Sequence, residues 1–194
     1  MKINFIRHGA TAGNLQKRYI GITDEALCEQ GILELLKLKP MLEQSNLIIT
    51  SPMLRCIQTA NILFPEQEIK IWEDFRECNF GEFENKNYLE LCDNLNYQNW
   101  IASNGTACFP NGESPENFKL RTIKAFEKLI KIYHENITII AHGGTIMAIL
   151  EKFAVPEQNY YDYQIANANG YATEYINNKL HVLTKIKPKS VINC

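Results

Sequence analysis

The chain has 194 residues, a length that favours one domain with a substantial core. Its formal net charge of -2 argues against a general nucleic-acid binder or a protein attached to a membrane surface. No apolar run approaches the roughly 18 residues needed to span a bilayer, and Lys2 leads at once into an alternating segment rather than a secretory leader. The cysteines show no CxxC spacing. We therefore expect free thiols and a cytoplasmic protein.

The first third of the chain alternates between strand and helix patterns. In chain order, the patterns predict a strand over 1–6, a loop over 10–26, a helix over 27–44, a strand over 46–50, a helix over 51–63 and a strand over 68–72. Pro40 is expected to kink or end the first helix. Ser51 and Pro52 have the form of an N-cap and a first helical residue.

The rest of the chain begins with an irregular segment and ends in a hairpin. In chain order, we expect a lid over 73–113 with a short helix near 88–95, a helix over 114–134, a strand over 137–141, a helix over about 145–153 and strands over 171–176 and 179–186. Asn177 and Asn178 form a two-residue turn between the last two strands.

This order of elements predicts the fold class. Strands that alternate with helices are typical of a parallel sheet covered on both faces, and a terminal hairpin adds an antiparallel edge. We therefore expect a single domain over residues 1–194. Its fold would be α/β, with three α/β/α layers, a mixed, mostly parallel sheet and a helical and loop lid insertion at about 73–113.

Polar and charged motifs follow several of the predicted strands. They are Arg7-His8-Gly9, the stretch from Ser51 to Arg55, Glu77, and His142-Gly143-Gly144. Ligands of open α/β sheets bind at the carboxyl ends of the strands, so these motifs are expected to converge. Two histidines, two arginines and a carboxylate in one cleft would suit phosphoryl transfer without a metal.

Each of these groups has a chemical use. A neutral His8 imidazole can attack phosphorus and form a phosphohistidine, while Arg7 and Arg55 hold the phosphoryl oxygens. Glu77 can supply the proton that an alkoxide leaving group needs, provided that burial raises its pKa. Taken singly, each residue also fits a structural role. His8 could be a hydrogen-bonded strand-end residue and Arg55 a solvated surface charge.

Further donors are available for the same anion. Asn14 and His142 can each donate to a phosphoryl oxygen, and the amides after Gly143 open a helix N-terminus, which favours anions. Because the motifs occur together and in this order, we interpret them as one site.

The motifs also resemble a known family. The sequences Arg-His-Gly-Ala-Thr at 7–11, Ser-Pro-Met-Leu-Arg-Cys-Ile-Gln-Thr-Ala at 51–60, Arg-Glu-Cys-Asn-Phe-Gly-Glu-Phe-Glu at 76–84 and Ala-His-Gly-Gly at 141–144 resemble the histidine phosphatase superfamily, phosphoglycerate mutase-like branch. The resemblance implies His8 as the phosphorylated nucleophile and Glu77 as general acid and later base. It implies a phosphate pocket of Arg7, Arg55, Asn14 and His142, substrate hydrogen bonding near Gly21, and no metal or cofactor.

The composition of the lid indicates which class of substrate is favoured. Lys86 is the only basic residue between Glu77 and Phe118, whereas a mutase needs further cations for a second phosphate and a carboxylate. Four lid aromatics could stack on a flat neutral leaving group or could form the lid's own core: Tyr88, Tyr97, Trp100 and Phe109. The run Pro-Asn-Gly-Glu-Ser at 110–114 is similar to α-ribazole phosphatases.

We therefore expect a metal-independent phosphomonoesterase, with α-ribazole 5′-phosphate of cobalamin biosynthesis as the favoured substrate. The alternatives are a broad-specificity phosphatase of small metabolites, a phosphoglycerate mutase, or a non-catalytic module that binds phosphorylated ligands. The expected partner is a small-molecule phosphomonoester, not a nucleic acid or a membrane. Either a monomer or a homodimer is compatible with the sequence.

Overall fold

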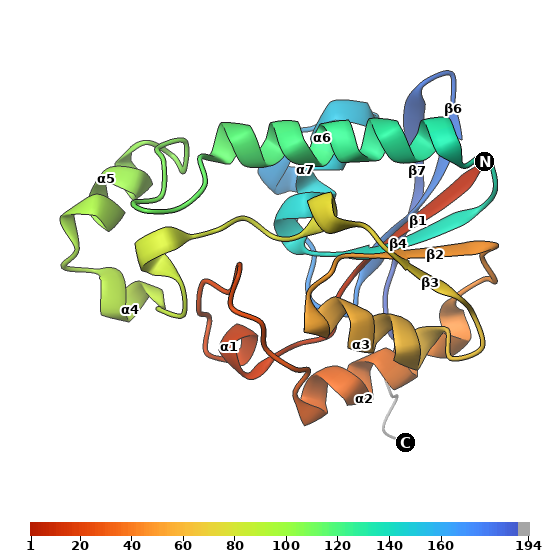
Figure 1. Ribbon diagram of the computed structural model, residues 1–194, viewed down its shortest axis with the longest axis horizontal. Coiled ribbons are helices and arrows are strands. Elements are labelled where there is room, and N and C mark those ends of the chain that lie inside the picture. The colour runs from red at the N-terminus through yellow and green to blue at the C-terminus, as the bar shows by residue number, and fades with distance from the viewer. Residues whose placement is uncertain (190–194) are drawn as a thin grey trace.

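The computed structural model describes residues 1–189, which form a seven-stranded sheet between two layers of helices (Figure 1). The strand order is β3-β2-β4-β1-β6-β7-β5. The strands are β1 (Lys2–Arg7), β2 (Leu47–Thr50), β3 (Ile69–Ile71), β4 (Ile137–Ala141), β5 (Ala154–Val155), β6 (Gly170–Ile176) and β7 (Lys179–Ile186). Strands β3, β2, β4 and β1 pair in parallel, while β6 is antiparallel to both of its neighbours. The predicted α/β class with a mixed, mostly parallel sheet is confirmed.

Helices cover both faces of the sheet. The α-helices are α1 (Ala12–Leu15), α2 (Glu29–Leu38), α3 (Leu54–Leu63), α4 (Tyr88–Leu91), α5 (Leu95–Ala102), α6 (Pro115–Ile132) and α7 (Gly143–Phe153). The short 3-10 helices are η1 (Lys39–Met41), η2 (Glu73–Phe75), η3 (Gly81–Phe83) and η4 (Tyr160–Tyr163). Helices α6 and α7 lie on one face, and α2 and α3 lie on the other (Figure 1).

The central strands are buried on both faces because successive side chains of a strand point in opposite directions. Phe5 of β1 contributes to the core below α6 and α7, where its ring lies 6.0 Å from that of Phe126. The next residue, Ile6, packs into the opposite core with Leu35 of α2 and Ala60 of α3. A hydrophobic core therefore packs on each face of the sheet. Together the two cores fix the position of the edge where β1, β2 and β4 end.

The helix after β2 begins later than predicted. Its N-cap is Met53, so the prediction of a cap at Ser51 and a first helical residue at Pro52 is wrong. The Ser51 hydroxyl instead accepts a 3.3 Å hydrogen bond from the Met53 amide and shares one of 2.7 Å with Nε2 of His142. The Ser51 hydroxyl, which the sequence pattern predicts as a helix cap, therefore hydrogen-bonds to a buried imidazole instead.

Other boundaries differ by a few residues. Helix α2 ends just before Pro40, which lies in η1, as the sequence predicts. The loop after β1 contains the short helix α1, the lid holds two α-helices rather than one, and β5 was not predicted. Asn177 and Asn178 have φ of 50° and 62°, which confirms the expected hairpin turn because such turns require positive φ at both positions.

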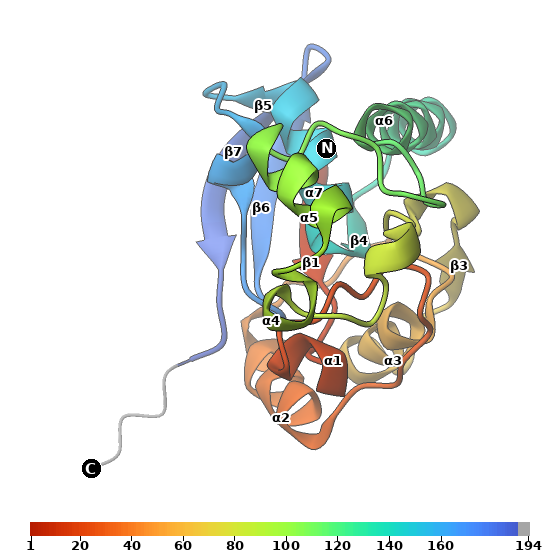
Figure 2. The ribbon, with the colours of Figure 1, turned by 90° about the vertical axis from the view of Figure 1, so that its left-hand side faces the viewer.

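The lid, residues 73–113, lies beside the carboxyl ends of the parallel strands (Figures 1 and 2). It has an aromatic core in which the Phe83 ring lies 5.4 Å from Tyr97 and 5.7 Å from Phe109. The Trp100 ring stacks on Tyr97 at 6.0 Å, whereas Tyr88 is 53% exposed. Of the two uses open to these aromatics, the structure thus favours the lid's own core.

Two further findings concern cysteines and helices. Five cysteines are free thiols in the described part of the chain, and Cys194 lies outside it. Within residues 1–189, no helix combines the length and apolar character that a membrane span requires. The single-domain assignment over 1–194 stays a prediction.

The aromatic core of the lid can be tested through stability. Phe83 is fully buried, so Phe83→Ala should lower the free energy of unfolding by about 3–5 kcal/mol. Leu95→Ala is the matched control, because Leu95 lies in the same lid but is 74% exposed, and it should change that free energy by no more than about 0.5 kcal/mol. Chemical denaturation measures both. Equal effects would show that the lid aromatics are not a packed core.

Candidate active site

The predicted site residues converge at the carboxyl edge of the sheet. His8 directly follows β1, and His142 follows β4 as the N-cap of α7. Their rings lie 5.1 Å apart between centroids in an edge-on arrangement. Arg55 lies in the first turn of α3, and Glu77 lies in the chain between η2 and η3. The site is thus assembled from segments that are far apart in the sequence.

His8 has the form of a neutral nucleophile. Its side chain is 3% exposed, and Nδ1 lies 2.7 Å from the carbonyl oxygen of Gly9. Because a carbonyl can only accept, we assign the ring proton to Nδ1, which leaves a lone pair on Nε2. Burial, assisted by the charges of Arg55 and Arg7, holds the pKa of His8 well below its usual 6.5. At neutral pH the imidazole is therefore uncharged and able to attack.

Arg7, which is partly buried, and Arg55, which is fully buried, bring two cations to the site. Nη1 of Arg7 donates to the carbonyl of Ile165 at 2.7 Å, and the two Nη atoms of Arg55 donate to the carbonyls of Thr23 at 2.9 Å and Gly21 at 2.8 Å. The Nε atom of each guanidinium is buried and has no hydrogen-bond partner within residues 1–189. A buried donor without an acceptor is costly. Two such donors beside a nucleophile fit a site for an anion.

Glu77 interacts electrostatically with the same two arginines and is 8% exposed. Its Oε1 accepts a 3.0 Å hydrogen bond from the amide of Cys78, and its Oε2 accepts one of 3.2 Å from the amide of Gly144. Burial raises the pKa of the carboxyl above its usual 4.5, against the lowering effects of these amides and of the two arginines. The group is thus prepared to hold a proton that it can later release.

His142 supports the pocket as a neutral hydrogen-bonding group. It is fully buried, and its Nε2 lies 2.7 Å from the Ser51 hydroxyl and 3.6 Å from the sulfur of Cys56. Burial and then the nearby charge of Arg55 keep the pKa of His142 well below 6.5. His142 therefore offers a donor or an acceptor but no positive charge.

The three predicted ligand-binding positions have different surroundings. Asn14 uses its side-chain oxygen inside the protein, accepting from the amide of Thr11 at 3.3 Å. Gly21 donates its amide to Glu84 at 3.1 Å. A Cβ at Gly143 would lie no closer than 3.5 Å to Arg7, an ordinary contact. These positions remain predictions as ligand contacts.

Gly144, which was not singled out from the sequence, has a tighter requirement than Gly143. A Cβ at Gly144 would lie 2.5 Å from Oε1 of Glu77, closer than real contacts allow. A larger residue there would have to displace the Glu77 carboxyl, which lies directly against the start of α7.

Asn167 is a site residue that sequence reasoning missed. Its amide nitrogen donates to the carbonyl of His8 and to the side-chain oxygen of Asn14, both at 3.1 Å, and lies 3.5 Å from Nδ1 of His8. It therefore joins the strand that carries the nucleophile to the loop that follows. A single Asn in a loop gives no sequence pattern that would predict such contacts.

Glu84 was quoted within a motif but not recognised as a structural anchor. Its carboxylate accepts from the amides of Gly21, Ile22 and Thr23 at 3.1, 2.9 and 3.3 Å, and from the Thr23 hydroxyl at 2.7 Å. Arg55 donates to carbonyls of the same loop from the opposite side. The loop is therefore held between a carboxylate and a guanidinium.

This arrangement combines a neutral imidazole, two guanidinium donors and a carboxyl with a raised pKa. These groups suit transfer of a phosphoryl group to the imidazole with protonation of the leaving oxygen. Within residues 1–189, no three His, Cys, Asp or Glu side chains are grouped so as to hold a metal ion.

Comparison with known proteins gives relatives along nearly the whole chain. Residues 3–186 match the model of the histidine phosphatase superfamily (branch 1). The chain is 24% identical to the adenosylcobalamin/alpha-ribazole phosphatase of Escherichia coli K12, over 98% of each chain. It is 28% identical to the 2,3-bisphosphoglycerate-dependent phosphoglycerate mutase of Blochmanniella floridana, over 78% of this chain and 82% of the mutase.

Solved structures show the same fold. The crystal structure of a phosphoserine phosphatase mutant from Entamoeba histolytica superposes with a TM-score of 0.84 at 21% identity and covers 98% of this chain and 99% of that one. These relatives differ in the substrates that their names give, while sharing one architecture. The family match over 3–186, on the fold described above, shows that this chain belongs to branch 1 of the histidine phosphatase superfamily and is a hydrolase of that type.

Proposed function

We propose that this protein is a metal-independent phosphomonoesterase that works through a phosphohistidine at His8. One observation carries the proposal. His8 is neutral and buried, and its Nε2 carries the lone pair. The charges of Arg7 and Arg55 act on both His8 and Glu77, and the Nε donors of these two arginines have no partner within residues 1–189. A phosphoryl group is an anion that would occupy those donors and present phosphorus to the imidazole.

In the first step, the lone pair on Nε2 of His8 attacks phosphorus and forms an N–P bond. The bond from phosphorus to the ester oxygen breaks, and its electron pair stays on that oxygen. Glu77 transfers its proton to the leaving oxygen, so an alcohol departs. Arg7 and Arg55 stabilise the charge on the three phosphoryl oxygens.

In the second step, water attacks the phosphohistidine. The carboxylate of Glu77 accepts a proton from the water, an O–P bond forms, and the N–P bond to His8 breaks. Inorganic phosphate leaves, and the imidazole returns to its neutral form. Burial of Glu77 serves both steps because it keeps the pKa of the group within reach of proton uptake and release.

For the substrate, we propose α-ribazole 5′-phosphate, acted on in the cytoplasm by a monomer or homodimer. The similarity to an alpha-ribazole phosphatase over 98% of each chain supports this choice. Lys86, the only basic residue between Glu77 and Phe118, donates to the carbonyl of Glu82 rather than extending the anion site. The 28% identical relative supports the alternative of a phosphoglycerate mutase. The scarcity of basic residues between Glu77 and Phe118 disfavours that alternative. A broad-specificity phosphatase is the remaining enzymatic alternative.

A substrate panel tests this assignment. The purified protein should hydrolyse α-ribazole 5′-phosphate with a kcat/KM about 100-fold above those for 3-phosphoglycerate, phosphoserine and p-nitrophenyl phosphate, because contacts to the leaving group discriminate between substrates. Release of inorganic phosphate is measured without added metal and with a chelator. Similar values for all four compounds would exclude the specific substrate and favour a broad phosphatase.

The nucleophile is tested by His8→Ala. This change should lower kcat at least about a thousandfold because the covalent route is lost. Labelled phosphate from the substrate should be trapped on the native protein as an acid-labile adduct and should be absent from the variant. His134→Ala, at an exposed position of the same residue type, is the control and should behave as the native protein. Phosphate binding without turnover by the native protein would instead support the non-catalytic module.

The acid role of Glu77 predicts a pH dependence. Because burial raises its pKa, Glu77 stays protonated above pH 4.5, and kcat/KM for an alkyl phosphate should fall as pH rises through that raised pKa. His8, with its lowered pKa, should limit activity only well below pH 6.5. Glu77→Gln should remove this alkaline limb and lower kcat/KM by about 100- to 10,000-fold.

Two comparisons make that test specific. The kcat/KM for p-nitrophenyl phosphate should change little in Glu77→Gln, because the phenolate leaves without protonation. Glu116→Gln, at an exposed position, should preserve the native pH profile. An unchanged alkaline limb in Glu77→Gln would contradict the acid assignment.

A further inference from the structure

Arg121 and Glu113 form a two-fold hydrogen-bonded ion pair next to the segment that carries Glu77. Arg121 lies on α6, and Glu113 lies just before that helix. Nε of Arg121 donates to Oε1 of Glu113 at 3.0 Å, and Nη2 donates to Oε2 at 2.8 Å. The two side chains are only 13% and 20% exposed. A bidentate pair of this kind has a defined geometry, unlike a flexible surface ion pair.

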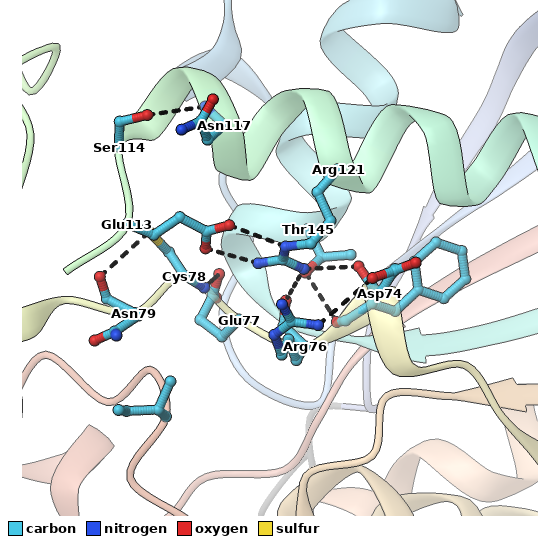
Figure 3. Close-up of polar contacts among 12 residues, drawn as sticks. Asp74, Arg76, Glu77, Cys78, Asn79, Glu113, Ser114, Asn117, Arg121 and Thr145 are labelled. Atoms are coloured by element: carbon cyan, nitrogen blue, oxygen red, sulfur yellow. Dashed lines mark hydrogen bonds and ion pairs between the residues drawn. The ribbon is translucent and has the colours of Figure 1, made fainter.

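The same pair contacts the chain on both sides of Glu77 (Figure 3). Nη1 of Arg121 donates to the carbonyls of Asp74 at 2.8 Å and Arg76 at 3.1 Å, immediately before Glu77. The backbone amide of Glu113 donates to the carbonyl of Asn79 at 2.9 Å, two residues after it. The ion pair thus links the two halves of a clamp around the catalytic segment.

Glu77 depends on such contacts because its own segment has little regular structure. It lies between η2 and η3, outside any strand or α-helix. Its carboxyl must meet the amide of Gly144 at the start of α7, and the Thr145 hydroxyl of that helix also holds the carbonyl of Phe75 at 3.2 Å. Helices α6 and α7 therefore set the position of the acid together, α7 at the carboxyl and α6 along the backbone.

We propose that the Arg121–Glu113 pair is a positioning device that holds the backbone of residues 74–79, so that the Glu77 carboxyl reaches the leaving oxygen. The inference rests on the proposed function, in which Glu77 is the general acid. In this proposal the pair binds only other parts of the protein and not the substrate. The pair acts by geometry, and displacement of a catalytic group by about 1 Å costs on the order of 100-fold in rate.

The test compares two leaving groups. Propyl phosphate needs a proton on its leaving oxygen, whereas p-nitrophenyl phosphate does not. The quantity measured for each substrate is kcat/KM, which reports the reaction up to formation of the phosphohistidine. Arg121→Gln should lower kcat/KM for propyl phosphate by about 10- to 100-fold and for p-nitrophenyl phosphate by less than about threefold. A general loss of structure would lower both values alike.

Arg76→Gln is the matched control. Arg76 is adjacent to Glu77 and carries the same charge, yet its side chain is 43% exposed and its nearest ion pair, with Asp74, is 3.5 Å long. Removing it changes the local charge but leaves the contacts of Arg121 in place. We expect both substrates to keep their native kcat/KM in this variant. A selective loss for propyl phosphate in Arg76→Gln would show that charge, not the clamp, is responsible.

Glu113→Gln provides a second route if Arg121→Gln does not fold, as judged by thermal denaturation. This variant keeps the Arg121 donors to the two carbonyls and the amide donor to Asn79, but it weakens the bidentate pair. A smaller loss, of a few fold, is expected for propyl phosphate alone. In a variant that keeps the native Tm, equal losses for the two substrates, or none for either, would overturn the proposal.

Glu77→Gln in the same assay separates the two proposals. If it affects both substrates equally, the acid role of Glu77 fails, and the positioning role fails with it. If Glu77→Gln is selective for propyl phosphate while Arg121→Gln is not, only the clamp is refuted and the proposed reaction stands.

Discussion

The burial of two guanidinium groups without carboxylate partners is the constraint on which the site depends. Within residues 1–189, neither Arg7 nor Arg55 forms an ion pair, and Arg55 is fully buried. Burial, assisted by their charges, lowers the pKa of His8 and so keeps this imidazole neutral. The two charges also favour an ionised Glu77, but burial outweighs them and its pKa is raised. The same cations therefore favour an anion at the site, while burial keeps His8 and Glu77 in the forms that the proposed reaction needs.

Uncompensated cations are expensive to bury, and the fold meets this cost with peptide dipoles. The loop 20–23 turns its carbonyls toward Arg55 and its amides toward Glu84. The peptide group between Gly21 and Ile22 meets both charges, because its carbonyl accepts from Arg55 and its amide donates to Glu84. Because Glu84 belongs to the lid and Arg55 to α3, this loop joins the lid to α3 through hydrogen bonds to two opposite charges.

Local patterns were sufficient to predict much of the fold and the proposed catalytic set. The run at 137–141 identifies a central strand because four of its five residues are apolar and occupy both faces, Thr138 being the one polar residue. His8, Glu77 and His142 were predictable because each follows a strand or lies in a motif. Contacts between distant segments were not predictable in this way. Asn167 meets His8 across 159 residues, and no local periodicity encodes that distance.

The Ser51 error has the same origin. Serine followed by proline is a sound local signal for a helix start, but the hydroxyl has a stronger use when a buried imidazole lies 2.7 Å away. His142 comes 91 residues later in the chain. Sequence patterns such as helix-cap signals describe contacts between residues that are close in the chain. The site instead depends on contacts between residues that are distant in the chain and that the sheet brings together.

The lid aromatics show how the same limit affects the substrate. Tyr97 and Phe109 are buried in the lid's own core, so their rings are not free to stack on a leaving group. A cavity of about 500 Å³ lies instead between the loop 20–23 and the lid, lined by Ile22, Thr23, Asn79, Gly81, Glu82, Glu84 and Asn111. Its carboxylates would repel a second anionic group, whereas its amides and hydroxyl can hydrogen-bond a neutral one. Polarity and charge, rather than aromatic stacking, are therefore what this surface of the lid offers to a ligand.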